Sequence, residues 1–256
     1  MNARQSLNVL AVLALLAVNA LANALPLNGQ STGEISDRFQ VYFVPAGYVF
    51  SIWGVIYAGL IAFAVYQALP SQRDNFRLQD ITPWFLLSSA ANVVWLFLWH
   101  YNVFLLTVPV MLALLVSLII IYLRLGIGRS GASAAETWLV RLPFSIYLGW
   151  ITVATAANLS AVLWWLGWNG QPLAPEVWAV LVILAAGVLS WLMSLTRNDV
   201  AYALVIAWAL AGIAFKQASV PAVSLAAWAV AFLVLLVMTF GVVRSGRLYG
   251  TSAAAS

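Results

Sequence analysis

Eight long apolar stretches constrain this chain more than any other feature of its sequence. Each is free of charged side chains except at its ends, and each approaches the roughly 20 residues that a helix needs to cross a hydrocarbon core of about 30 Å. Inside a bilayer the backbone must satisfy its own hydrogen bonds, which a helix does within one segment. We therefore predict an all-α fold, a polytopic membrane helix bundle of about eight transmembrane helices. The predicted spans are residues 7–25, 48–67, 81–99, 103–123, 142–166, 177–195, 199–215 and 222–243.

Composition excludes several other classes of protein. Of the 256 residues, 64% are hydrophobic and only 7% are charged, whereas soluble domains carry about 25% charged residues. The chain has no cysteine, which rules out disulfides, thiolate chemistry and cysteine-ligated metals. Its formal charge of +4 comes from scattered basic residues without a basic run, so we expect lipid contact and no nucleic-acid partner.

Basic residues are distributed unevenly over the two sides of such a bundle. With eight spans, nine of the eleven basic residues fall on the side of the two termini, and only Arg38 and Lys216 fall on the other. By the positive-inside rule, both termini are predicted to be cytoplasmic. The first span ends near Ala22-Asn23-Ala24, which resembles a signal-peptidase site, so cleavage after this span stays open.

The predicted membrane interior carries essentially no ionisable group. Proton relays and ion-coupled transporters usually need such a group near mid-membrane, which argues against both classes. Lys216, the single lysine, ends a span and has no carboxylate counter-ion within one, so a retinal protein is not expected. The single histidine, His100, is expected at the interface and not as a metal ligand. No buried base is present for a Ser-His-Asp arrangement.

Neutral polar and aromatic residues form stripes on three of the predicted helices. Residues three, four and seven apart share one helical face. Each stripe combines an indole ring with a side chain that can hydrogen-bond, as the wall of a ligand pocket does. Packing between helices and an interfacial aromatic belt would give similar patterns, so both interpretations stay open. The stripes are Trp53 and Tyr57 in residues 48–67; Asn92, Trp95 and Trp99 in residues 81–99; and Tyr147, Trp150 and Asn158 in residues 142–166.

Two loops stand out between the predicted spans. Residues 27–44, on the outer side, begin polar and end aromatic, as expected of a lid over a cavity or of an ordinary surface loop with interfacial aromatics. Phe43, Pro45 and Gly47 would join such a lid to the next helix. Residues 124–141 are rich in small residues, and we expect a flexible linker there without nucleotide binding.

Four segments follow one another in an order typical of a known family. They are VPAGYVFSIWGVIYAGL, LLSSAANVVWLFLW, NVFLLTVPVMLALLV and YLGWITVATAANLSAVLWW. The first resembles a Pro-rich start followed by an Ile-Trp-Gly-x-x-Tyr helix. The second resembles a third helix bearing Asn and Trp, and the last resembles a Tyr-Leu-Ala-Trp helix with Asn seven to nine residues on. With the first span, residues 7–168 resemble the TspO/MBR family, the tryptophan-rich sensory proteins related to the mitochondrial translocator protein.

The resemblance implies a five-helix membrane bundle in residues 1–168, with a pocket roofed by the first loop. Residues 169–256 would then form an additional three-helix membrane segment and a short cytoplasmic tail. Proteins of this family bind porphyrins and other tetrapyrroles, sterols and aromatic drugs among indole rings. Carried over position by position, the resemblance implies that the ligand-binding residues are Trp53, Tyr57, Asn92, Trp95, Tyr147, Trp150 and Asn158.

The chain also departs from the family pattern. The stretch 43–46 reads Phe-Val-Pro-Ala where the family commonly has Trp-x-Pro-Pro, which argues against porphyrin chemistry that depends on that tryptophan. Pro143 lies four residues before Tyr147, where the family usually sets the two side by side. The last three spans have no counterpart in the five-helix family. We expect a structural role for them, with a second wall of a pathway as the alternative.

Together these features predict a membrane receptor or carrier for a hydrophobic aromatic ligand, with a link to tetrapyrrole or stress sensing. A secondary transporter of a neutral organic solute and a light-dependent porphyrin-degrading membrane protein are the alternatives. We expect no catalytic residue, no metal site and no required cofactor, with a porphyrin, haem-like or sterol-like molecule as the ligand. The expected partners are that ligand and the lipid bilayer, with a homodimer as the alternative to a single chain. We expect the protein in a bacterial inner (cell) membrane.

Overall fold

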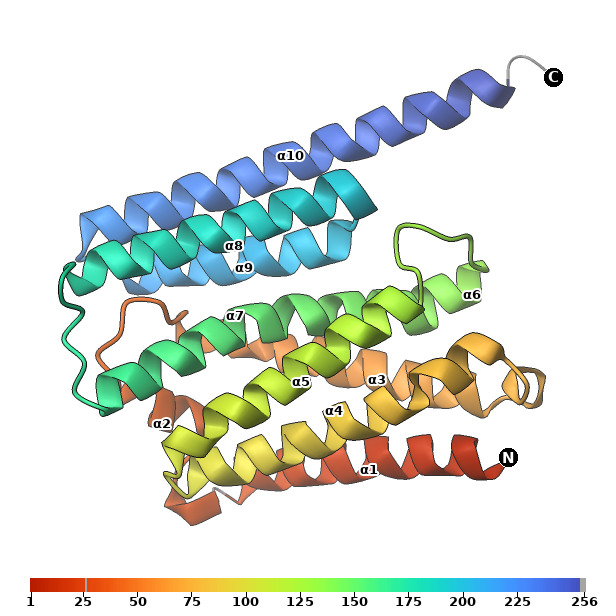
Figure 1. Cartoon of the computed structure of the whole chain (residues 1–256), viewed down its shortest axis with the longest axis horizontal. Coiled ribbons are helices and arrows are strands. Elements are labelled where there is room, and N and C mark those ends of the chain that lie inside the picture. Colours follow the sequence, from red (N-terminus) through yellow and green to blue (C-terminus); the bar gives the residue numbers. More distant parts are fainter. Residues whose placement is uncertain (26, 254–256) are drawn as a thin grey trace.

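Long helices make up almost all of the fold (Figure 1). The computed structural model describes residues 1–25 and 27–253, and the side chains of residues 1–22, 24–25 and 27–240. The long helices are α1 (Ala3–Ala24), α3 (Ile52–Ala68), α4 (Phe76–His100), α5 (Phe104–Arg124), α7 (Leu142–Trp165), α8 (Pro175–Arg197), α9 (Val200–Lys216) and α10 (Pro221–Ala253). The short ones are η1 (Leu27–Gly29), α2 (Thr32–Asp37), η2 (Gly47–Ser51), η3 (Pro70–Gln72), α6 (Ala134–Glu136) and the π turn η4 (Thr137–Arg141).

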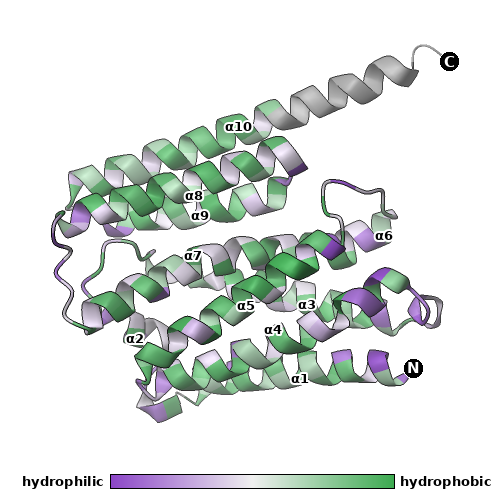
Figure 2. Cartoon of the chain, in the orientation of Figure 1, coloured by the Kyte–Doolittle hydropathy of each residue, from purple (hydrophilic) through white to green (hydrophobic). Residues whose placement is uncertain are grey.

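Seven helical segments of the described chain are long and apolar enough to cross a membrane, and α9 is shorter. With 17 residues, α9 spans about 26 Å, close to the thickness of a hydrocarbon core. The predicted fold class, an all-α polytopic membrane bundle of about eight helices, is confirmed, and the chain is an integral membrane protein. Figure 2 shows the hydrophobic residues along the helices and the hydrophilic ones mainly at helix ends and in loops.

The helices form two groups that meet along α7. The first group holds α1, α3, α4, α5 and α7, and the second holds α8, α9 and α10 (Figure 1). Helix α9 makes the main contact between them because it packs on α7, while α8 and α10 pack on α9. Helix α1 begins and α10 ends at the same end of the bundle, and α2 lies at the opposite end.

The helix ends follow local sequence signals, with one exception. Pro175 and Pro221 begin α8 and α10, where the missing N–H costs little. The predicted span 81–99 would put Pro83 within its first three residues, where proline is tolerated, but the structure places Pro83 well inside α4. The reason is that Asn75 caps this helix about two turns earlier, by accepting a hydrogen bond from the Leu78 amide at 3.3 Å.

Residues 134–141 are helical where the sequence predicted a flexible linker. Helix α6 begins after Ser133, whose hydroxyl accepts a hydrogen bond from the Glu136 amide at 3.1 Å. The π turn that follows leads without a break into α7. The linker is therefore confined to the glycine-containing stretch before Ser133.

An ion cluster holds this turn against α4. Glu136 accepts from Arg77 at 3.0 Å and from Arg141 at 3.1 Å. The Arg141 guanidinium also donates to the carbonyl of Ser130 at 2.6 Å. Glu136 and Arg141 are both buried, so each charge depends on the other for compensation. This cluster lies at the end of the bundle opposite α2.

Candidate functional site

Residues 27–46, between α1 and η2, cover one end of the bundle and are called the lid below (Figure 1). One edge of the lid is bonded to the end of α4. Asn28 Nδ2 donates to the carbonyl of His100 at 3.0 Å, and Trp99 Nε1 donates to the carbonyl of Thr32 at 3.3 Å. These contacts fix η1 and α2 over the first group of helices.

The other edge of the lid is bonded to side chains of α8 and α9. Tyr42 Oη donates to Glu176 at 2.8 Å, and Lys216 forms an ion pair with Asp37 at 2.7 Å. The hydrogen bond to the Glu176 carboxylate raises the pKa of the Tyr42 hydroxyl above its ordinary value. The lid thus contacts both groups of helices.

The backbone of the lid also approaches the end of α9 closely. The Ala46 amide donates to the carbonyl of Gly212 at 3.2 Å, and Gln217 Nε2 donates to the carbonyl of Tyr42 at 3.2 Å. A Cβ at Gly212 would collide with the side chain of Val49. Glycine is therefore what lets α9 lie against the segment that follows the lid.

A cavity of about 50 Å³ lies beneath the lid. Its walls come from the lid, η2, α4 and α7, and they are almost entirely apolar. It has room for a few water molecules. The lining residues are Thr32, Ser36, Val41, Val44, Pro45, Phe50, Trp95, Trp99, Trp150, Val153, Ala154, Ala157, Asn158 and Ala161.

Three buried polar atoms of residues that line this cavity have no hydrogen-bond partner among the described residues. They are Nε1 of Trp95, Nε1 of Trp150 and Oδ1 of Asn158. The amide nitrogen of Asn158 donates to Thr107 Oγ1 at 2.9 Å. A buried polar group without a partner costs about 1–3 kcal/mol. The wall of this cavity thus includes three residues with two donors and one acceptor still to be satisfied, as a site for the polar edge of a ligand requires.

Three further residues predicted to bind the ligand form one hydrogen-bonded cluster with a fourth residue, Asn19. They are Asn92, Tyr147 and Tyr57. Asn92 Nδ2 donates to Tyr147 Oη at 3.0 Å, and Asn92 Oδ1 accepts from Asn19 Nδ2 at 2.9 Å. Tyr57 Oη donates to Asn19 Oδ1 at 2.8 Å. These bonds connect α1, α3, α4 and α7, which is the helix-joining role that the sequence left open, and none of the four residues lines the cavity.

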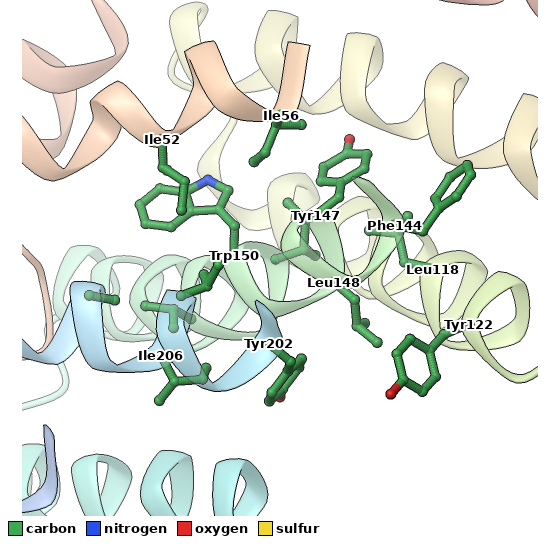
Figure 3. Close-up of a cluster of buried hydrophobic side chains, with 14 of the residues drawn as sticks. Ile52, Ile56, Leu118, Tyr122, Phe144, Tyr147, Leu148, Trp150, Tyr202 and Ile206 are labelled. Atoms are coloured by element: carbon green, nitrogen blue, oxygen red, sulfur yellow. The ribbon is translucent and has the colours of Figure 1, made fainter. Parts of the chain in front are cut away.

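Trp53 lies between this polar cluster and the cavity. Its ring stacks on Tyr57, with centroids 5.5 Å apart and planes at 26°. Its edge contacts with Tyr147 and Trp150 are 5.9 Å and 6.3 Å between centroids. Figure 3 shows Tyr147 and Trp150 pointing from α7 toward α3. Trp53 thus packs against Trp150 but does not itself line the cavity.

The three residues predicted to join the lid to the next helix differ in their surroundings. Pro45 lines the cavity, and Phe43 is buried, with 2% of its surface exposed. Gly47 begins η2, and a Cβ there would meet no atom within 4 Å. Nothing around Gly47 therefore requires a glycine, and the hinge role of these residues stays a prediction.

Sequence reasoning did not select several residues that the structure brings to the site. Trp99 shares the predicted face of Asn92 and Trp95, and this signal agrees with its place in the cavity wall. The sequence signal for Asn19 was a polar amide side chain within the otherwise apolar span of residues 7–25. Thr107 was not singled out. The lid was predicted as a segment, but a loop has no periodicity that shows which of its side chains face inward.

His100 is buried beneath the lid, although the sequence suggested the interface. Its Nδ1 lies 2.8 Å from the carbonyl oxygen of Leu96, and its Nε2 lies 3.5 Å from Thr32 Oγ1. Among the described side chains, those of residues 1–22, 24–25 and 27–240, no three His, Asp or Glu are grouped so that they could hold a metal ion.

Removing the amide at the centre of the polar cluster is expected to destabilise the bundle. Asn92→Leu leaves Asn19 and Tyr147 with one bond fewer each, and hydrogen bonds between membrane helices are worth about 0.6 kcal/mol on average. We expect the free energy of unfolding to fall by about 1 kcal/mol, measured by SDS titration with tryptophan fluorescence. Ser190→Ala is the control, because the buried Ser190 hydroxyl has no partner among the described residues. Equal stability of the Asn92 variant and the unchanged protein would contradict the helix-joining role.

Comparison with known proteins agrees with this arrangement. A family model described as TSPO-like protein matches residues 5–240. The matched stretch includes α8, α9 and most of α10, the helices without a counterpart in the five-helix pattern. No curated protein and no solved structure matches the chain. The resemblance seen in the sequence is confirmed, and the chain belongs to the family of TSPO-like proteins.

Proposed function

We propose that this protein is a membrane receptor or carrier that binds a hydrophobic aromatic ligand in the cavity beneath the lid. The observation that carries the proposal is that Trp95, Trp150 and Asn158 line that cavity while Nε1 of each tryptophan and Oδ1 of Asn158 are buried without a hydrogen-bond partner among the described residues. Ligand pockets typically combine apolar walls with a few polar groups that fix the orientation of the ligand. This cavity has both.

The size of the cavity defines how binding would occur. At about 50 Å³, it is far smaller than the roughly 300–1,000 Å³ of pockets that enclose drug-sized ligands. A tetrapyrrole or a sterol-like molecule therefore enters only if the lid moves away from α4 and α7. Such a movement has to break the hydrogen bonds and the ion pair at the edges of the lid and to expose its buried side chains Ile35, Phe39 and Phe43.

Indole chemistry favours a flat ligand. Trp95 and Trp99 stack with centroids 5.3 Å apart and planes at 17°, and Trp150 meets Phe50 edge to face at 5.6 Å. Flat apolar rings gain from contact with such faces. Within the TSPO-like family, a porphyrin or another tetrapyrrole is the ligand class that we propose. It would be bound as a ligand, without a cofactor role.

Protoporphyrin titration of the purified protein tests the proposal. We expect saturable quenching of tryptophan fluorescence and a shift of porphyrin absorbance. Trp150→Phe keeps most of the ring contact but removes one donor, so the affinity should fall roughly three- to tenfold. Trp228→Phe is the matched control, because Trp228 of α10 is 50% exposed and does not line the cavity.

Absence of saturable binding, or equal affinity in the Trp150 and Trp228 variants, would overturn this proposal. Flux of the bound porphyrin into proteoliposomes distinguishes a carrier from a receptor. Loss of porphyrin in light, with none in dark or oxygen-free samples, would instead indicate a porphyrin-degrading protein.

We further propose that both termini are cytoplasmic in a bacterial inner membrane, because nine of the eleven basic residues lie on that side of the predicted topology.

A further inference from the structure

We propose that the groove between α7 and α8 is a second binding site, which takes a hydrophobic organic cation from the bilayer. The groove has a volume of about 780 Å³, within the usual range for sites of drug-sized ligands. Its walls are α7, the start of α8, the turn between them and the lid. It exists because α8 leans on α9 and leaves space beside α7. The residues that carry the proposal are Tyr42, Trp164, Trp168, Trp178 and Glu176.

The aromatic walls are suited to hold a cation. Trp164 and Trp168 are each 41% exposed and both line the groove. Trp168 lies against Trp178, with ring centroids 5.5 Å apart. Trp178 Nε1 donates a hydrogen bond to the carbonyl of Gly170 at 2.6 Å. The polar edge of Trp178 is thus already satisfied. The face of an indole ring attracts a positive charge within about 6 Å.

A carboxylate at the mouth of the groove supplies the complementary charge. Glu176 follows Pro175, which lines the groove, and it accepts a hydrogen bond from Tyr42, which lines it too. Across the part of the chain that the structure describes, Glu176 has no ion-pair partner, and the groove has no Lys or Arg in its lining. Its place in the first turn of α8 gives it a favourable interaction with the helix dipole, which stabilises the negative charge without neutralising it.

The charge of the occupant follows from three features of the groove: its apolar walls, its indole faces and a carboxylate that has no ion-pair partner among the described residues. An uncharged lipid chain would use the apolar walls alone, and an anion would be repelled by Glu176. A cation with an apolar body uses all three features. The groove shares only Val41 with the cavity beneath the lid, so this proposal does not depend on the function proposed above.

Tetraphenylphosphonium and tetraphenylborate, which have similar bodies and opposite charges, test the proposal. Each is titrated into the full chain in phosphatidylcholine nanodiscs, with empty nanodiscs subtracted. We expect saturable binding of tetraphenylphosphonium that is at least tenfold tighter than that of tetraphenylborate. Glu176→Gln keeps the acceptor for Tyr42 but removes the charge. It should lower the affinity for tetraphenylphosphonium roughly threefold to tenfold.

Trp168→Leu provides a second, independent variant, because the exposed ring of Trp168 can be removed without opening the core. It should also lower the affinity for tetraphenylphosphonium about threefold or more. Trp228→Leu, on an exposed face of α10 away from the groove, should not. Equal binding of the two probes would mean that the groove takes any apolar molecule, lipid included, and would overturn the proposal. Cation binding that neither Glu176→Gln nor Trp168→Leu changes would overturn it as well.

Discussion

Gly212→Leu is expected to displace the lid and to destabilise the protein by about 1–3 kcal/mol, the usual cost of forcing extra volume into a packed region. A Cβ at position 212 would collide with the fully buried Val49 and would lie 3.3 Å from Cβ of Pro45. The carbonyl of Gly212 accepts a hydrogen bond from Ala46 at 3.2 Å, which a shifted α9 cannot keep. Both contacts hold the segment that joins the lid to α3.

Unfolding in SDS, followed by tryptophan fluorescence, measures this effect, and limited proteolysis of residues 27–46 reports whether the lid has moved. Gly54→Leu is the matched control, since Gly54 also lies in a membrane helix and a Cβ there would meet no atom within 4 Å. The interpretation fails if the two variants lose stability equally, or if the lid of Gly212→Leu is cleaved no faster than that of the unchanged protein.

Glu136→Ala is expected to have the largest effect on stability, about 3–5 kcal/mol, because it leaves a buried guanidinium without its counter-charge. Side chains of Glu136 and Arg141 are only 10% and 7% exposed, and the two groups lie 3.1 Å apart. The carbonyl of Ser130 bound to Arg141 offers only a partial negative charge in compensation. The π turn before α7 should then lose its anchor on α4.

Asp80→Ala is the control for this charge effect. Asp80 pairs with Arg124, and these side chains are 32% and 39% exposed, so water can take over from the lost partner. We expect a change within about 1 kcal/mol. Thermal unfolding in detergent compares the two variants. A loss for Glu136→Ala no greater than for Asp80→Ala would show that the cluster contributes little beyond a surface ion pair.

Hydropathy alone predicted the helices, because apolar length is the same physical requirement that the bilayer imposes. Segments with mixed character were predicted less well. The predicted span 81–99 starts only two residues before Pro83, since the rule that proline avoids helix interiors takes no account of a helix that begins two turns earlier, after Asn75. Residues 134–141 were read as part of a linker, because the charged pair that anchors the turn joins residues distant in sequence, Arg77 and Glu136.

The candidate site was predictable as faces of helices and not as contacts. The spacing of Trp95, Trp150 and Asn158 placed each on an inward face, and all three meet at the cavity. The same spacing could not show that Asn92 and Tyr147 would bond to each other. Which polar tips pair depends on small rotations of α4 and α7, and these are set by packing along the whole helix. The lid was indicated as a segment, but its sequence has no pattern that shows which of its side chains face the cavity.

The lid, bonded to α4 along one edge and to α8 and α9 along the other, has a thermodynamic consequence. A ligand that displaces it has to break contacts with α8 and α9, so its affinity depends on how firmly α9 is packed. Linkage makes this dependence reciprocal. If loosening α9 raises the affinity for such a ligand by some factor, binding of the ligand shifts the equilibrium toward the loosened α9 by the same factor. The last three helices are thereby part of the ligand equilibrium, although none of their side chains lines the cavity.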